Sequence, residues 1–209
     1  MKWIAGLLSV WALQISAADT PVAPAPAAAP ALQTEKKDAR EPIKPRNDIP
    51  GLKNFAKVSD VLYRGEQPSK EGFAELKKMG VKTIVNLRSF NSDRGELKGL
   101  GLQYAHIYCK AWNPEDEDVV KFLKIIQNKD NHPVFVHCQH GADRTGMMVA
   151  IYRMMEQGWS VDESRTEVEN FGFHKIWKDI QKYLKRFDPE KMRRKVAESD
   201  EEAGVEVVK

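Results

Sequence analysis

Apolar and polar residues follow two different patterns through the middle of the chain. Short apolar runs rich in β-branched residues have the length of buried strands. Between them lie longer stretches in which apolar residues recur every three or four positions, as on one face of a helix. The strands predicted in this way are Val58–Arg64, Val81–Leu87, Leu102–Tyr108 and Val134–Val136. The predicted helices are Lys70–Met79, Asp93–Leu100, Asp116–Gln127, Arg144–Gln157, Val161–Asn170 and Ile176–Phe187.

The alternation of strands with helices predicts an α/β fold with a mostly parallel central sheet, flanked by helices on both faces. Val134–Val136 is wholly apolar, as expected for a strand of a parallel sheet that is covered on both sides. Ser69 is placed to cap the first helix, and Gly80 is placed to end it.

The first residues of the chain, 1–18, have the pattern of a secretory signal peptide. Lys2 provides a positive start, Trp3–Ile15 is apolar, and Ser16–Ala18 offers small residues for cleavage. The apolar run of 13 residues is too short to cross a hydrocarbon core of about 30 Å as a helix. We therefore expect an exported protein, periplasmic or secreted, with an uncleaved anchor as the alternative.

Composition divides the remainder into three parts. Residues 19–48 are first rich in proline and alanine and then charged, which predicts an extended linker. The folded domain is predicted over 49–188. Residues 189–209 carry a basic cluster and then an acidic one, and we expect them to form a solvated charged tail.

The overall charge is nearly balanced, with 33 lysines and arginines against 30 aspartates and glutamates. A net charge of +3 gives no reason to expect a nucleic-acid partner. No other stretch of the chain approaches membrane-spanning length, so stable membrane insertion is not expected. We expect a monomer.

The chain contains two cysteines, Cys109 and Cys138. In an exported protein two cysteines can form a disulfide. Cys109 could also capture an oxidised Cys138, or could simply be a small buried apolar residue. The residues around Cys138 favour a different role for that thiol.

The segment from His137 to Gly146 joins the apolar strand to the apolar helix. Its backbone N–H groups and the start of the helix would face one small volume, which is an anion site. Gly141 allows a sharp turn, and Gly146 is expected to let the helix pack closely against the sheet. The helix dipole and the N–H donors favour the thiolate of Cys138.

Arg144 follows Cys138 by six positions and can bring its planar guanidinium back to the same volume. A guanidinium binds two phosphate oxygens at once, whereas a lysine ammonium cannot. The predicted phosphate-binding residues are Gln139, His140, Gly141, Ala142, Asp143 and Arg144.

This pattern, Cys-x5-Arg-Thr-Gly from Cys138 to Gly146 with His137 before it, resembles the cysteine-based protein tyrosine and dual-specificity phosphatase superfamily. Leu62–Ser69 and Val85–Arg88 also resemble segments of small bacterial dual-specificity-type phosphatases, so the similarity covers roughly residues 54–187.

The resemblance implies that Cys138 attacks phosphorus to form a phosphocysteine and that Arg144 stabilises the charge on the phosphoryl group. It also implies that Thr145 stabilises the departing thiolate and that His137 supports the loop from behind. No metal or other cofactor is expected, because backbone amides and Arg144 supply the positive field.

The general acid is predicted less directly. Asp116 lies 22 residues before Cys138 in an acidic segment, where this superfamily keeps its movable acid loop. The same carboxylate could instead cap the helix that begins there. Asp143, immediately before Arg144, is the other candidate, since some members of the superfamily carry an aspartate at that position.

The sequence leaves the substrate open between a phosphorylated protein and a phosphoinositide or inositol phosphate. Two remoter alternatives are a rhodanese-like sulfurtransferase, which also holds a cysteine at a strand-to-helix turn, and an inactive phosphate-binding module. Arg144-Thr145-Gly146 argues against the first, and the intact Cys138 and Arg144 argue against the second.

Overall fold

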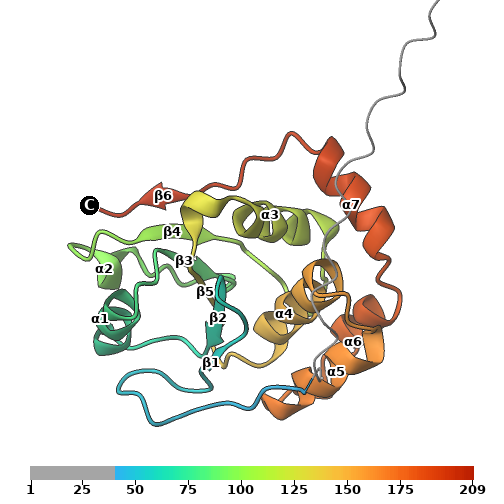
Figure 1. Cartoon of the computed structure of the whole chain (residues 1–209), viewed down its shortest axis with the longest axis horizontal. Helices are drawn as coiled ribbons and strands as arrows, with labels where there is room; N and C mark the ends of the chain where they lie inside the picture. Colours follow the sequence, from blue (N-terminus) through green and yellow to red (C-terminus); the bar gives the residue numbers. More distant parts are fainter. Residues whose placement is uncertain (1–40) are drawn as a thin grey trace, which may run out of the picture. The chain divides into compact units, whose positions relative to one another are not determined.

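The computed structural model describes residues 41–209, so the predicted signal peptide and most of the predicted linker lie outside the described residues. The described part forms a six-stranded sheet in the order β1-β2-β5-β3-β4-β6 (Figure 1). Its strands are β1 (Ala56–Lys57), β2 (Leu62–Gly65), β3 (Thr83–Asn86), β4 (Gln103–His106), β5 (Val134–His137) and β6 (Glu206–Val207). The four inner strands are parallel, and the two edge strands are antiparallel to their neighbours.

Helices cover both faces of this sheet, as the sequence predicts (Figure 1). The helices are α1 (Lys70–Lys78), α2 (Arg94–Leu97), α3 (Asp116–Gln127), α4 (Asp143–Glu156), α5 (Val161–Asn170), α6 (Lys178–Lys185) and α7 (Pro189–Glu198), with a 3-10 turn at Lys129–Asn131. One face carries α1 and α2, and the other carries α3 and α4 with the C-terminal helices beyond them. The predicted fold class is confirmed.

Each face buries its own apolar cluster. Phe73 of α1 packs with Tyr104 and Phe135 of the sheet on the first face. On the second face, the apolar side of α3 and nearly the whole of α4 pack with Val136 in a larger cluster. Among residues 41–209, no helix is both long enough and apolar enough to cross a membrane.

The predicted strand Val58–Arg64 is wrong in its first half. β1 ends at Lys57 and β2 begins at Leu62, and the backbone N–H groups of Val58 and Ser59 both donate to the carbonyl oxygen of Leu62. The segment is a hairpin turn, because Ser59 and Asp60 favour turns more strongly than the alternating pattern favours a strand.

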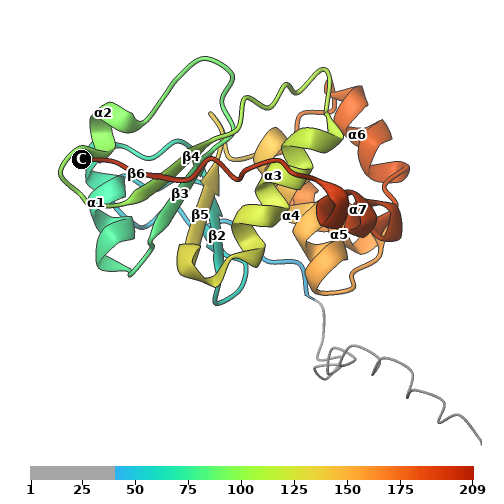
Figure 2. The same cartoon turned by 90° about the horizontal axis from the view of Figure 1, so that it is seen from above.

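The C-terminal segment is also not the solvated tail that its charge suggests. Asp188 caps α7 by accepting hydrogen bonds from two backbone N–H groups, and Met192 and Val196 of α7 are buried. Figure 2 shows the chain continuing from α7 past α3 to β6, which pairs with β4. Most charged residues of α7 are exposed, while two apolar residues four positions apart anchor the helix.

The fold also begins earlier than residue 49. Arg46 pairs with Phe55 through two backbone hydrogen bonds, and the backbone N–H of Ile43 donates to Glu167. The charged stretch before residue 49 therefore includes an ordered lead-in to β1.

Candidate active site

The loop from Cys138 to Arg144 leaves the carboxyl end of β5, which lies between β2 and β3. In the sheet register Gly65 of β2 and Asn86 of β3 both stand beside His137. The segments that follow these three strands therefore meet at one edge of the sheet. This arrangement brings Gln67 and Arg88 toward the loop from either side.

The carbonyl groups of the loop are held from outside. The oxygen of Gln139 accepts from the backbone N–H of Gln67, that of His140 from the Asn54 side chain, and that of Gly141 from Arg64. In a trans peptide the following N–H points away from the carbonyl. The N–H groups of His140, Gly141 and Ala142 are consequently directed toward the centre of the loop, as an anion cradle requires.

The two glycines of the loop serve close contacts. Gly141 has φ +65°, and a Cβ there would lie 2.4 Å from the backbone of Gly65. At Gly146 a Cβ would lie 3.0 Å from the Val168 side chain of α5. The prediction that Gly146 lets the helix pack closely against the sheet is wrong, because α5 covers that side of α4.

Cys138 is 2% exposed and lies at the base of the loop. Thr145 is fully buried one turn into α4, and its hydroxyl finds no hydrogen-bond partner among the residues that the structure describes. A buried hydroxyl without a partner is costly unless a charged group uses it. The guanidinium of Arg144 is half-buried, and its Nη1 donates to the carbonyl of Leu87 at 3.2 Å.

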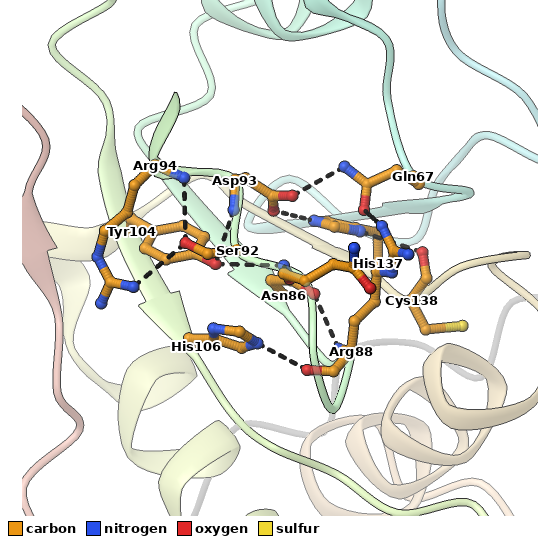
Figure 3. Close-up of polar contacts among 11 residues, drawn as sticks. Gln67, Asn86, Arg88, Ser92, Asp93, Arg94, Tyr104, His106, His137 and Cys138 are labelled. Carbon is orange, nitrogen blue, oxygen red and sulfur yellow. Dashed lines mark hydrogen bonds and ion pairs between the residues drawn. The ribbon is translucent and has the colours of Figure 1, made fainter. Parts of the chain in front are cut away.

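His137 is fully buried behind the loop and is held by Asp93 (Figure 3). Its Nε2 lies 2.8 Å from Oδ2 of Asp93, and its Nδ1 lies 3.1 Å from the carbonyl oxygen of Cys138. These two contacts fix the orientation of the ring behind the nucleophile.

Asp93 is fixed in turn by a polar network that the sequence analysis missed. Gln67 donates to its other carboxylate oxygen at 2.8 Å and accepts from Arg88 at 3.1 Å (Figure 3). The pattern predicts only that Asp93 begins a helix. Asp93 does precede α2, but its side chain makes no capping hydrogen bond. Its position on a buried turn links the loops after β2, β3 and β5.

Arg64 is a second residue that the sequence analysis missed. Its side chain is fully buried, its Nη2 donates to Gly141 at 2.7 Å, and its guanidinium lies 3.6 Å from the ring centre of Phe171. Burial lowers the pKa of Arg64 to about 9, while Glu167 and Cys138 act in the opposite direction. Arg64 therefore stays charged at neutral pH and holds the loop from below.

Asp116, the predicted acid, is committed to other partners. Its carboxylate accepts from Tyr183 at 2.7 Å and forms an ion pair with Lys195. Partial burial alone would raise the pKa of Asp116, but hydrogen bonds from Lys195 and Tyr183 bring it below its usual value. The carboxylate lines a cavity of about 310 Å³ between α3, α6 and α7, and the phosphate loop contributes no residue to that lining.

Asp143, the alternative acid, lies on the loop itself and is buried. Its Oδ1 accepts from the backbone N–H of His174 at 2.8 Å, and its Oδ2 lies 2.9 Å from Nδ1 of the same histidine. His174 is half exposed, so this pair connects the loop to solvent. His174 carries no signal in the sequence pattern, because it lies 31 positions from Asp143 and only the fold brings it to the loop.

Cys109 and Cys138 are both free and buried. Burial, with a smaller contribution from the charge of Asp118, raises the pKa of Cys109 well above its usual value. A thiol that stays protonated is a slow nucleophile toward an oxidised cysteine. The structure thus favours the small buried apolar role for Cys109 over a redox role.

A family model described as the tyrosine phosphatase family matches residues 50–205. The dual specificity protein phosphatase TpbA of Pseudomonas aeruginosa is 29% identical over 150 residues, which are 70% of this chain and 68% of the relative. The inositol diphosphatase SIW14 of Saccharomyces cerevisiae is 27% identical over 150 residues, which are 68% of this chain and 53% of the relative.

Solved structures of both relatives match the fold. The crystal structure of TpbA has a TM-score of 0.66 at 28% identity, covering 76% of this chain and 99% of that one. A TpbA variant was also solved in complex with pTyr. The catalytic domain of SIW14 has a TM-score of 0.63 at 26% identity, covering 71% of this chain and 93% of that one.

Proposed function

The chain belongs to the tyrosine phosphatase family, and from that premise we propose that it hydrolyses phosphate monoesters on protein side chains, phosphotyrosine above all. It is a cysteine-dependent phosphatase. The observation that carries the proposal is the loop from Cys138 to Arg144, three of whose carbonyls accept hydrogen bonds from residues outside the loop.

In the proposed reaction, the Cys138 thiolate attacks phosphorus while the substrate oxygen leaves with a proton from a general acid. Water then displaces the thiolate from the phosphocysteine, and the acid, now a base, takes the proton of that water. The loop amides and Arg144 stabilise the charge on the phosphoryl oxygens. The unpartnered hydroxyl of Thr145 is available to stabilise the thiolate that departs.

We assign the general acid to Asp143 in preference to Asp116. A general acid must reach the substrate oxygen, and Asp116 is held by Lys195 and Tyr183 in a cavity to which the phosphate loop contributes no residue. Asp143 is adjacent to Arg144 in the phosphate loop, and its contact with the half-exposed His174 connects it to solvent. Asp116 then has a structural role: its contacts with Tyr183 and Lys195 hold α3 against α6 and α7.

Asp143→Asn should lower kcat by roughly 10²–10⁴-fold with an alkyl or unactivated phenyl phosphate. The loss should shrink with 4-nitrophenyl phosphate, because nitrophenolate leaves without protonation. Asp116→Asn is the matched control and should leave kcat nearly unchanged with both substrates while lowering the midpoint of thermal unfolding. If Asp116→Asn instead shows the leaving-group dependence, Asp116 is the acid and Asp143 is not.

Two features of the loops at this edge of the sheet favour a protein substrate whose phosphorylated side chain is aromatic. The loops that follow β3 and β4 at the same edge carry the exposed side chains of Phe90, Tyr108 and Trp112, which can contact a phenyl ring. Within the phosphate loop, Arg144 is the one lysine or arginine, whereas a ligand with many phosphates is bound by several cations.

A panel of a phosphotyrosine peptide, a phosphoserine peptide and an inositol diphosphate tests this assignment. We expect the highest kcat/KM with the phosphotyrosine peptide. A higher kcat/KM with the inositol diphosphate would contradict the phosphotyrosine assignment. It would instead favour inositol diphosphatase activity, which is the activity in the names of SIW14 and of the Arabidopsis thaliana relative DSP4.

We also propose that the enzyme acts outside the cytoplasm, on the strength of the signal-peptide pattern of residues 1–18. Cell fractionation with the mass of the mature chain is the test. Full-length protein found only in the cytoplasm would contradict export.

A further inference from the structure

We propose that His140, Asp143 and His174 form a binding site for one divalent cation of the zinc type at the rim of the phosphate loop. One candidate ligand atom from each of these side chains lies within 4.8 Å of the others. Two of the residues belong to the loop, and the third arrives from the segment after α5. The site is thus built by the tertiary fold and is absent from any short sequence motif.

The spacing is close to that of a bound ion. In a tetrahedral zinc site with bonds near 2.0–2.1 Å, neighbouring ligand atoms lie roughly 3.3 Å apart. Nδ1 of His174 already lies 2.9 Å from Oδ2 of Asp143. The rings of His140 and His174 have centroids 5.7 Å apart. Because the side chain of His140 is exposed, a rotation about its own bonds can bring its ring to the third position.

The surroundings hold two of the ligands in place. Oδ1 of Asp143 accepts from the backbone N–H of His174 at 2.8 Å, which orients the carboxylate and leaves Oδ2 for the ion. The backbone of His140 is anchored where its carbonyl accepts from Asn54. Exposure of both histidines gives the ion a path from solvent.

The ligand set determines which ions fit. Two neutral imidazoles and one carboxylate are the donors that zinc uses where it keeps an open position for water or substrate. Magnesium and calcium prefer oxygen ligands throughout. Arg64 and Arg144 carry positive charge near the loop and weaken the binding of any cation, so the affinity should be lower than that of a zinc site without neighbouring cations.

An ion bound here would engage the carboxylate of Asp143. This consequence rests on the proposed function, in which Asp143 carries the proton: as a metal ligand it could not do so, and turnover would slow. The binding itself does not depend on the function, because it can be measured in a protein without the nucleophile.

The experiment uses the tag-free Cys138→Ser protein, because a thiolate is itself a strong zinc ligand. Zn²⁺ is titrated in competition with a chromophoric chelator, and Co²⁺ is used as a spectroscopic substitute. We expect one equivalent of Zn²⁺ to bind and Co²⁺ to show the visible absorption of a protein-bound ion. Adding His140→Ala or His174→Ala should weaken binding by at least about tenfold.

His132→Ala is the matched control, because the ring of His132 bonds the carbonyl of Ile126 away from the loop, and it should not change the affinity. Unchanged affinity in the His140→Ala protein, or no stoichiometric binding in the parent, would overturn the proposal. Since His174 also contacts buried Asp143, its variant is checked by thermal unfolding. If that variant is unfolded, the exposed His140→Ala variant decides alone.

Discussion

Cys138→Ser is expected to abolish turnover, with a loss on the order of 10⁴-fold or more. A thiol ionises far more readily than a serine hydroxyl, which stays protonated at neutral pH. His137 is not free to act as its base, because the ring is held by Asp93 and the Cys138 carbonyl. The measurement is steady-state hydrolysis of 4-nitrophenyl phosphate by protein purified free of other phosphatases.

Two controls separate lost chemistry from lost structure. The Cys138→Ser protein should still bind inorganic phosphate with an affinity close to that of the wild type, because Arg144 and the loop amides are unchanged. Cys109→Ala removes the other buried thiol and should keep most of the wild-type kcat. Substantial turnover in the serine variant, or loss of turnover in both variants, would contradict the assignment of the nucleophile.

The parts of the fold that follow from local pattern were predictable. Ser69 caps α1 by accepting from the backbone N–H of Gly72, and α3 and α5 have the bounds that their apolar spacing indicates. The strand Val134–Val136 is fully buried, as its uniform apolarity requires. In each case the deciding interactions lie within a few residues of one another.

The nucleophile and the phosphate clamp were predictable for a related reason, since Cys138 and Arg144 lie on one short turn. Arg64 and Asp93 were not, because each acts through a partner 44 or more positions away: Gly141 for Arg64 and His137 for Asp93. Spacing along the chain gives no signal for such pairs, and a buried charge is visible only when the fold encloses it.

The C-terminal segment shows a different limit. Counting charges in residues 189–209 predicts a solvated tail, yet Met192 and Val196 bury one side of α7. Lys195 of that helix then pairs with Asp116. The C-terminal segment, predicted to be a solvated tail, therefore supplies a contact of Asp116. This contact is one reason to choose Asp143 over Asp116 as the general acid.

Arg144→Lys should reduce kcat/KM by at least about 10²-fold although the charge is kept. A guanidinium presents two parallel N–H groups to two phosphoryl oxygens, whereas an ammonium is a point charge that cannot reproduce this geometry. Arg144 also donates to the carbonyl of Leu87 at 3.2 Å, a bond that sets the direction of the guanidinium. Lysine has a shorter reach for that contact and would be less well oriented.

The split between kcat and KM identifies which state the guanidinium stabilises. If Arg144 contacts the phosphoryl group most strongly in the transition state, kcat should fall by most of the total loss while KM rises only slightly. Arg165→Lys, on α5 where the partly exposed Arg165 pairs with Asp162, is the matched control for the same substitution and should retain wild-type kinetics. A near-normal kcat/KM in Arg144→Lys would mean that a point charge is sufficient and that the forked contact is not part of the mechanism. An equal loss in the Arg165→Lys control would assign the effect to the stability of the helical layer.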